Sequence, residues 1–139
     1  MTTAKFSYVV NEGDFISAGQ ASEDAKMQLK KLGLKDEFIR KVVICMYEGE
    51  INMVIHANGG TAEVEITPVK VAVTLTDTGK GIPNISEAMR EGFSTATDEI
   101  RSMGFGAGMG LPNMKKYSDS LIIRSKVGEG TTVKMEFEI

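Results

Sequence analysis

Four segments of this chain are expected to be strands and are joined in pairs by short connections, which constrains the fold more than any other feature. Residues 61–67 and 69–76 form the first pair, with Pro68 near the turn between them. Residues 121–125 and 131–137 form the second pair. The first pair alternates between apolar and polar residues, a period of two that indicates strands with one buried face, and a short turn joins antiparallel neighbours. The sequence therefore predicts two hairpins in a sheet with much antiparallel pairing.

Helical segments surround these hairpins. Residues 15–32 and 36–58 carry apolar residues at helical spacing, and an alternating strand over residues 4–10 precedes both. A third helix is expected over residues 112–118, because proline is well tolerated in a first helical turn. Helices on one face of a mixed, mostly antiparallel sheet make an α+β fold, a two-layer α/β sandwich. We expect residues 1–139 to form a single domain, since 139 residues is within the usual domain size.

Composition excludes several classes of function. The net charge of −3 and the pI near 5.2 argue against general nucleic-acid binding. The single cysteine, Cys45, cannot form an internal disulfide, which fits a reducing compartment. The chain shows no secretory signal pattern and no apolar run of membrane-spanning length. We expect a cytoplasmic protein without a membrane or direct nucleic-acid partner.

Four glycines alternate with other residues in the run G-F-G-A-G-M-G-L, from Gly104 to Leu111. The run lacks the Lys-Ser/Thr pair of a Walker loop and the glycine offsets of a dinucleotide fingerprint. It leads into the expected helix at residues 112–118, and the free N–H groups of a helix N-terminus suit an anion. Alone, the run fits a phosphate-binding loop and a hinge without ligand equally well.

Polar residues form a stripe on the otherwise apolar second helix. Glu48, Asn52 and His56 are four residues apart and share a helix face. A carboxylate, an amide and an imidazole in line can hold a hydrated metal ion and a polarised water, and a solvated face is the alternative. Because the rest of the helix is apolar, we expect the stripe to border a cleft.

Two glycine-containing stretches lie at predicted strand ends. In Asp77-Thr-Gly79-Lys-Gly81, the aspartate can accept a hydrogen bond from an exocyclic amine, and the glycines let a flat ring approach the backbone. A simple turn is the alternative, because D-x-G is a common turn signal. Gly128-Glu-Gly130-Thr131, read alone, is a turn followed by a threonine.

Taken in this order, the motifs from Glu48 to Val133 resemble the GHKL, or Bergerat-fold, ATP-binding superfamily of gyrase, Hsp90, histidine kinases and MutL. The small size and the run M-G-F-G-A-G-M-G-L-P-N-M-K-K resemble the anti-sigma regulatory factors. These are free-standing bacterial serine/threonine protein kinases, and they include the stressosome switch kinases. The resemblance implies a protein kinase that binds ATP or ADP with Mg²⁺.

The resemblance also implies roles for individual residues. Glu48 would be the general base, and Asn52 the Mg²⁺ ligand. Glu50 is the rival acid, but it is turned about 200° from Glu48 on a helical wheel. Residues 84–103 would form the ATP lid. The implied cofactor-binding residues are Asn52, His56, Asp77, Gly79, Gly81, Gly104, Gly106, Gly108, Gly110, Leu111 and Thr131.

Among these, Asp77 would read the adenine amino group, Gly79 and Gly81 would shape the purine floor, and Thr131 would support the adenine end. Gly104 to Gly110 would close on the phosphates. Two roles stay open for His56: a contact to the ligands of the metal, or a position at the edge of the cleft.

The implied partner is a STAS-type anti-anti-sigma protein, with a sigma factor or another regulator as alternatives, and a homodimer is compatible with this. Two other functions stay open: a nucleotide-gated regulator with little catalysis, and a detached histidine-kinase catalytic domain. Gly49, beside Glu48, departs from expectation, because glycine in a helix costs about 1 kcal/mol relative to alanine. The first helix has no helper arginine. The remaining cations considered for the phosphates or for catalysis are Arg40, Lys80, Arg90, Arg101, Lys115 and Lys116.

Overall fold

The computed structural model describes residues 3–11, 13–14, 16–56, 59–79, 81–82, 85, 89 and 110–139. The elements in chain order are β1 (Ala4–Val10), α1 (Gln20–Lys31), α2 (Asp36–His56), β2 (Gly60–Ile66), β3 (Lys70–Asp77), α5 (Gly110–Tyr117), β4 (Ser120–Lys126) and β5 (Gly130–Glu138). This succession is the predicted one. No helix within the described ranges is long and apolar enough to cross a membrane.

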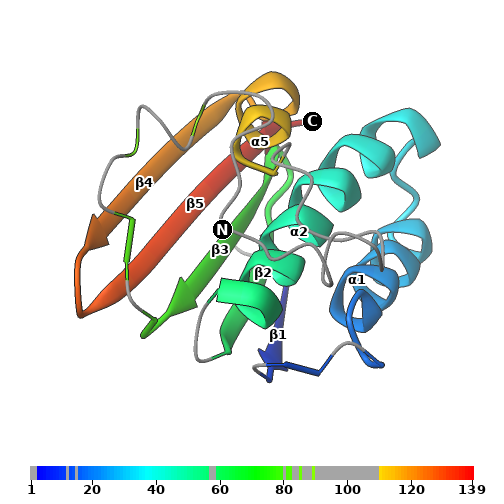
Figure 1. The fold of residues 1–139 in the computed structure, drawn as a ribbon. Coiled ribbons are helices and arrows are strands. Elements are labelled where there is room, and N and C mark those ends of the chain that lie inside the picture. Colours follow the sequence, from blue (N-terminus) through cyan, green and yellow to red (C-terminus); the bar gives the residue numbers. More distant parts are fainter. Residues whose placement is uncertain are drawn as a thin grey trace.

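The strands form a single sheet in the order β1-β2-β3-β5-β4, and each neighbouring pair is antiparallel (Figure 1). Both predicted hairpins are confirmed, because β2 pairs with β3 and β4 pairs with β5. Between the hairpins, β3 pairs with β5, and the register sets Asp77 opposite Thr131. Two residues that the motifs linked only by their order are therefore direct neighbours in the sheet.

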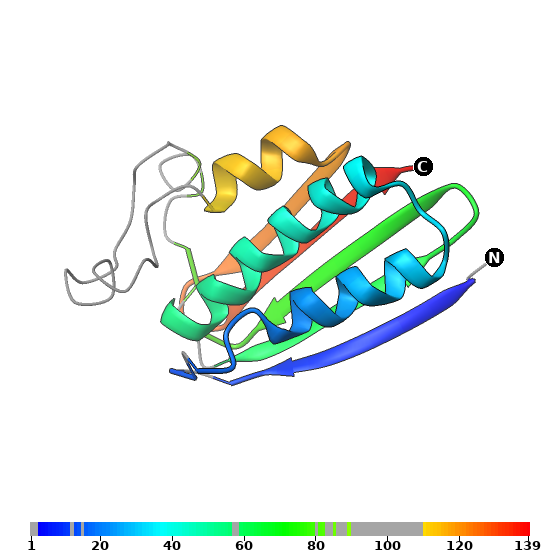
Figure 2. The ribbon, with the colours of Figure 1, turned by 90° about the vertical axis from the view of Figure 1, so that its right-hand side faces the viewer.

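The three helices α1, α2 and α5 lie on one face of the sheet (Figure 2), which confirms the two-layer sandwich. The core fills the space between the layers, and its fully buried side chains include Leu29, Val42, Met46, Val64, Val73 and Met135. The strands bury alternate residues, as the period of two predicts. The opposite sheet face is mostly polar, although Val9 and Ile122 are exposed on it, and Lys70 and Glu136 form an ion pair on neighbouring strands there.

Helix α1 begins at Gln20, so the predicted start near residue 15 is wrong. The Asp14 carboxylate accepts a hydrogen bond from the Ser17 amide at 3.1 Å, which closes a turn before the helix. Gly19 then adopts a left-handed backbone with φ of 95°, a conformation that glycine reaches without steric penalty. The turn and the glycine delay the helix although the apolar spacing starts earlier.

Close packing between α2 and β3 explains the unexpected glycine beside Glu48. A Cβ atom at Gly49 would overlap Leu75 Cδ1 and lie 3.3 Å from Met114 Cε. Leu75 and Met114 are buried core residues of β3 and α5. Gly49 therefore lets α2 approach the sheet closely at the turn that carries Glu48.

Candidate functional site

The first turn of α5 lies against the polar stripe of α2. A Cβ atom placed on Gly110 would lie 3.0 Å from Asn52 Nδ2 and 3.5 Å from Glu48 Oε2. The structure thus brings together Glu48, Asn52 and the last glycine of the G-x-G-x-G-x-G run. Because Gly110 has no side chain, the backbone at the start of α5 can approach both polar groups.

Glu48 is half-buried. Burial raises the pKa of the Glu48 carboxyl, and a side-chain hydrogen bond with Asn113 opposes part of this increase. A carboxylate with a raised pKa is a better proton acceptor near neutral pH than an exposed glutamate. Glu48 therefore combines access to the start of α5 with an environment suited to a general base.

Asp77 organises a second part of the site, at the end of β3. Its Oδ1 atom accepts hydrogen bonds from the Gly79 amide at 2.9 Å and the Thr131 amide at 3.2 Å. The Thr131 hydroxyl lies 2.8 Å from Ser125 Oγ on β4. The carboxylate thus holds together the chain after β3 and the start of β5.

The chain after β3 is also held against the β4–β5 hairpin. Ser125 Oγ accepts a hydrogen bond from the Ile82 amide at 2.7 Å. A Cβ atom on Gly81 would lie 2.5 Å from the Lys126 carbonyl oxygen, so this position requires a close backbone approach. Sequence reasoning missed Ser125, because a serine in a strand carries no motif signal; only its contacts with Ile82 and Thr131 reveal its role.

The two parts of the site lie at the same end of the sandwich, where β3 ends, α5 begins and the C-terminal half of α2 passes (Figure 2). Oxygen donors from Asn52 and Glu48 match the ligands that Mg²⁺ prefers. The described residues hold no cluster of three or more His, Cys, Asp or Glu suited to a metal. A magnesium ion here would therefore need further ligands from a phosphate and water, as is usual for this ion.

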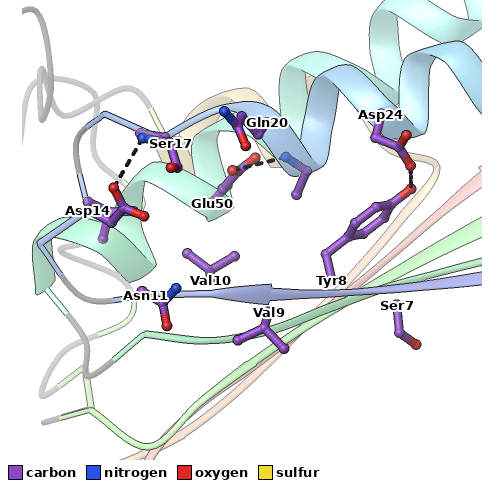
Figure 3. Close-up of a pocket in the computed structure, with 13 residues that line it drawn as sticks. Ser7, Tyr8, Val9, Val10, Asn11, Asp14, Ser17, Gln20, Asp24 and Glu50 are labelled. Atoms are coloured by element: carbon purple, nitrogen blue, oxygen red, sulfur yellow. Dashed lines mark hydrogen bonds between the residues drawn. The ribbon is translucent and has the colours of Figure 1, made fainter.

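Glu50, the rival acid, has a different task. It is 2% exposed and points toward the N-terminus of α1 (Figure 3). Its Oε2 atom accepts from the amides of Gly19 at 2.9 Å and Ala21 at 3.3 Å. Its Oε1 atom accepts from the Ser22 amide at 3.0 Å and the Ser22 hydroxyl at 2.8 Å. Glu50 thus caps α1 from a neighbouring helix, which leaves Glu48 as the acid facing the start of α5.

Leu111 is 8% exposed and belongs to the hydrophobic core, so its side chain packs under α5. Arg40, Lys115 and Lys116 are exposed on helix surfaces, as expected for solvated side chains. The side chain of His56, the backbone of Gly104, Gly106 and Gly108, and nearly all of the expected lid at 84–103 lie outside the described residues. Lys80, Arg90 and Arg101 lie outside them as well.

Comparison with known proteins identifies the family. The profile described as "Histidine kinase-, DNA gyrase B-, and HSP90-like ATPase" matches residues 41–139, a range that contains both parts of the site. The chain belongs to this family. Family membership implies ATP binding and confirms the resemblance to the GHKL superfamily.

Individual relatives narrow the comparison. The chain is 36% identical to the anti-sigma F factor of Pasteuria penetrans over 95 residues, which cover 63% of this chain and 60% of that protein. It is 27% identical to the serine/threonine-protein kinase RsbT of Bacillus subtilis over 130 residues, or 91% and 90% of the two chains. The matches with the first anti-sigma F factors span 60–62% of their length.

The fold has a counterpart among solved structures. A mycobacterial sensor histidine kinase, MprB, superimposes with a TM-score of 0.53 over 97% of each chain at 14% identity. At that identity the likeness concerns the fold, and it confirms the α+β sandwich of the histidine-kinase-like ATPases.

Proposed function

We propose that this chain is an ATP-dependent serine/threonine protein kinase that phosphorylates a small regulatory partner protein. The main support for this proposal is that Glu48 and Asn52 lie close to Gly110, where the glycine run leads into α5. One relative, of which the match covers 90%, is named a serine/threonine-protein kinase. A relative of which the match covers a smaller share is named an anti-sigma F factor.

In this proposal, each part of the site has one task. Asp77 accepts a hydrogen bond from the adenine amino group, and Thr131 supports the same end of the nucleotide. The N-terminal amides of α5 bind phosphate oxygens, because a helix N-terminus favours anions. Asn52 would hold Mg²⁺, which would supply positive charge against the phosphates. Such positioning and charge stabilisation supply most of the catalysis in phosphoryl transfer.

Glu48 is the proposed general base. A serine or threonine hydroxyl of the partner gives its proton to the Glu48 carboxylate as its oxygen bonds to the γ-phosphorus. The bond from that phosphorus to the β–γ bridging oxygen breaks, and ADP leaves with the electron pair of that bond. The acceptor we propose is a STAS-type anti-anti-sigma protein. We further propose a cytoplasmic protein whose single domain spans residues 1–139.

The name of the relatives with shorter matched segments, anti-sigma F factor, favours a second candidate, a nucleotide-gated regulator that binds a sigma factor or another partner with little catalysis. The two candidates differ in what Glu48 does. A kinase needs this carboxylate for transfer, whereas a binding regulator keeps its partner when the carboxylate is replaced by an amide.

The deciding experiment is transfer of phosphate from labelled ATP, with Mg²⁺, to a STAS-domain partner. Glu48→Gln should lower transfer by at least about 10²-fold, the usual minimum for a general base. Glu37→Gln, an exposed glutamate in the first turn of the same helix, is the matched control and should keep wild-type activity. Stoichiometric ATP binding without transfer to any partner would refute the kinase and favour the regulator.

A further inference from the structure

Ser125 lies on β4, opposite Thr131 near the start of β5, in the hairpin next to β3 (Figure 1). Its Oγ atom accepts a hydrogen bond from the Ile82 amide at 2.7 Å and lies 2.8 Å from Thr131 Oγ1. The Ser125 hydroxyl also donates to the Gly130 carbonyl oxygen at 3.2 Å. One hydroxyl therefore contacts two residues of β5 and the chain that follows β3.

Thr131 joins Ser125 to Asp77, the residue proposed to bind the adenine amino group. The Thr131 amide donates to Asp77 Oδ1 at 3.2 Å, and the register of β3 and β5 sets the two residues opposite each other. Gly130, just before Thr131, has φ of 122°, and a Cβ atom there would lie 2.1 Å from the Asp77 carbonyl oxygen. A glycine at this position therefore lets β5 begin directly against Asp77.

The hydrogen bonds fix where the hydroxyl protons of Ser125 and Thr131 lie. A hydroxyl donates one hydrogen bond and accepts up to two. Ser125 gives its proton to the Gly130 carbonyl oxygen and accepts from the Ile82 amide. Its remaining lone pair takes the proton of Thr131, 2.8 Å away. Thr131 Oγ1 is then left with lone pairs alone for a further bond, so a ligand that contacts this oxygen must bring a donor.

Purine bases differ in this respect at position 6. Adenine carries an amino group there, which donates, whereas a 6-oxo purine such as guanine carries a carbonyl oxygen, which accepts. The ionised carboxylate of Asp77 is also an acceptor only. Asp77 and Thr131 therefore both favour an amino group, and a carbonyl oxygen in its place would meet two acceptors with no proton between them.

We propose that Ser125 is a positioning residue that sets the preference of this site for adenine, because it holds the Thr131 hydroxyl as an acceptor beside Asp77. The inference rests on the proposed role of Asp77 in binding adenine and deepens it. Through the Ile82 amide, Ser125 also ties the chain after β3 to the same site. Replacement of Ser125 by alanine frees the Thr131 proton, which can then turn toward a carbonyl oxygen.

The first test compares the affinities for ATP and for inosine triphosphate, its 6-oxo analogue, by calorimetry with Mg²⁺. The wild-type protein should bind ATP at least about 10-fold more tightly, because the oxo group leaves polar atoms unpaired. Ser125→Ala should lower this ratio at least about threefold, and Ser125→Thr, which keeps the hydroxyl, should restore most of it. Ser120→Ala, a serine at the other end of β4, is the control and should leave the ratio unchanged.

An ATP preference in Ser125→Ala equal to that of the wild type overturns the inference. An equal loss of affinity for both nucleotides overturns it as well, because a purely structural role would give that result. The comparison needs no phosphate transfer, so a wild-type protein that is not a kinase leaves the inference to be decided by the ratio alone. A wild-type protein that binds both nucleotides equally, or neither, refutes the adenine role of Asp77 and the inference together.

A second measurement follows the Ile82 amide in ¹⁵N-labelled protein without nucleotide. Its hydrogen exchange should be at least about fivefold faster in Ser125→Ala than in the wild type, because the acceptor of this amide is lost. The exchange should be unchanged in Ser120→Ala. An unaltered exchange rate in Ser125→Ala would show that Ser125 does not hold the chain after β3, and the inference would fail even if the protein is an active kinase.

Discussion

Glu48 and Glu50 are two residues apart on one helix. We expect replacement of Glu48 to lower activity but not stability, and replacement of Glu50 to lower stability but not activity. Glu50→Ala removes a buried carboxylate that accepts from the amides of Gly19, Ala21 and Ser22 and from the Ser22 hydroxyl. Each buried donor left unsatisfied costs roughly 1–3 kcal/mol, and the loss of a helix N-cap costs up to about 2 kcal/mol. These terms overlap, and water entering the vacated space satisfies part of the lost bonds.

We therefore expect Glu50→Ala to lower the free energy of unfolding by about 2–4 kcal/mol. At this chain length each kcal/mol corresponds to roughly 3–4 °C, so Tm should fall by about 6–16 °C. Urea unfolding followed by circular dichroism measures the free energy, and a thermal scan measures Tm. Glu37→Gln, at an exposed position of the first turn of α2, should change stability by less than about 1 kcal/mol.

The split between the two glutamates is the sharper part of this prediction. Glu48→Gln should lower phosphotransfer at least about 10²-fold with little loss of stability, since it replaces a half-buried carboxylate by a neutral amide of similar shape. Glu50→Ala, assayed well below its Tm, should still transfer phosphate. A change in unfolding free energy below about 0.5 kcal/mol in Glu50→Ala would show that the carboxylate does not cap α1.

Three further predictions concern single sites. Gly49→Ala should lower the free energy of unfolding in urea by about 1–3 kcal/mol, because the new methyl group overlaps Leu75. A gain in stability would mean that helix propensity outweighs packing at this position. Asp77→Ala removes the acceptor of the Gly79 and Thr131 amides, so calorimetry should show ATP affinity reduced at least about 10-fold, which corresponds to roughly 1.4 kcal/mol. An ATP affinity equal to that of the wild type would refute the role of Asp77 in binding adenine. Burial, followed by the charge of Glu48, raises the pKa of Cys45 to about 12. Mass spectrometry should therefore find no iodoacetamide adduct on the folded protein at pH 8 and a full adduct in urea, and rapid labelling of the native protein would contradict the burial.

Local periodicity was sufficient to predict the strands, the long helix and the two hairpins, because alternation and helical spacing report which face of each element is buried. It was not sufficient for the start of α1. There the Asp14–Ser17 turn and the left-handed Gly19 override apolar spacing that continues back to residue 15. Helix termini depend on individual hydrogen bonds, which a periodicity of side chains does not record.

The candidate site divides in the same way. The order of the motifs alone predicted Glu48, Asn52, Asp77 and the glycine run as site residues, because these are recognisable residue types at recognisable spacings. Ser125 carries no such signal. Its task follows from a contact between distant segments, the hydrogen bond that Ser125 Oγ accepts from the Ile82 amide.

The amino-acid sequence by itself determined the two-layer α+β architecture, the ATP-binding family and which acid to test first, because these depend on local spacing and on residue type. Only the tertiary structure decided what Glu50 and Gly49 do. Glu50 caps a helix 28 or more residues away along the chain, and Gly49 makes room for Leu75 of β3. Both tasks arise where α2 packs against α1 and the sheet, and contacts between distant segments form only when the whole chain has folded.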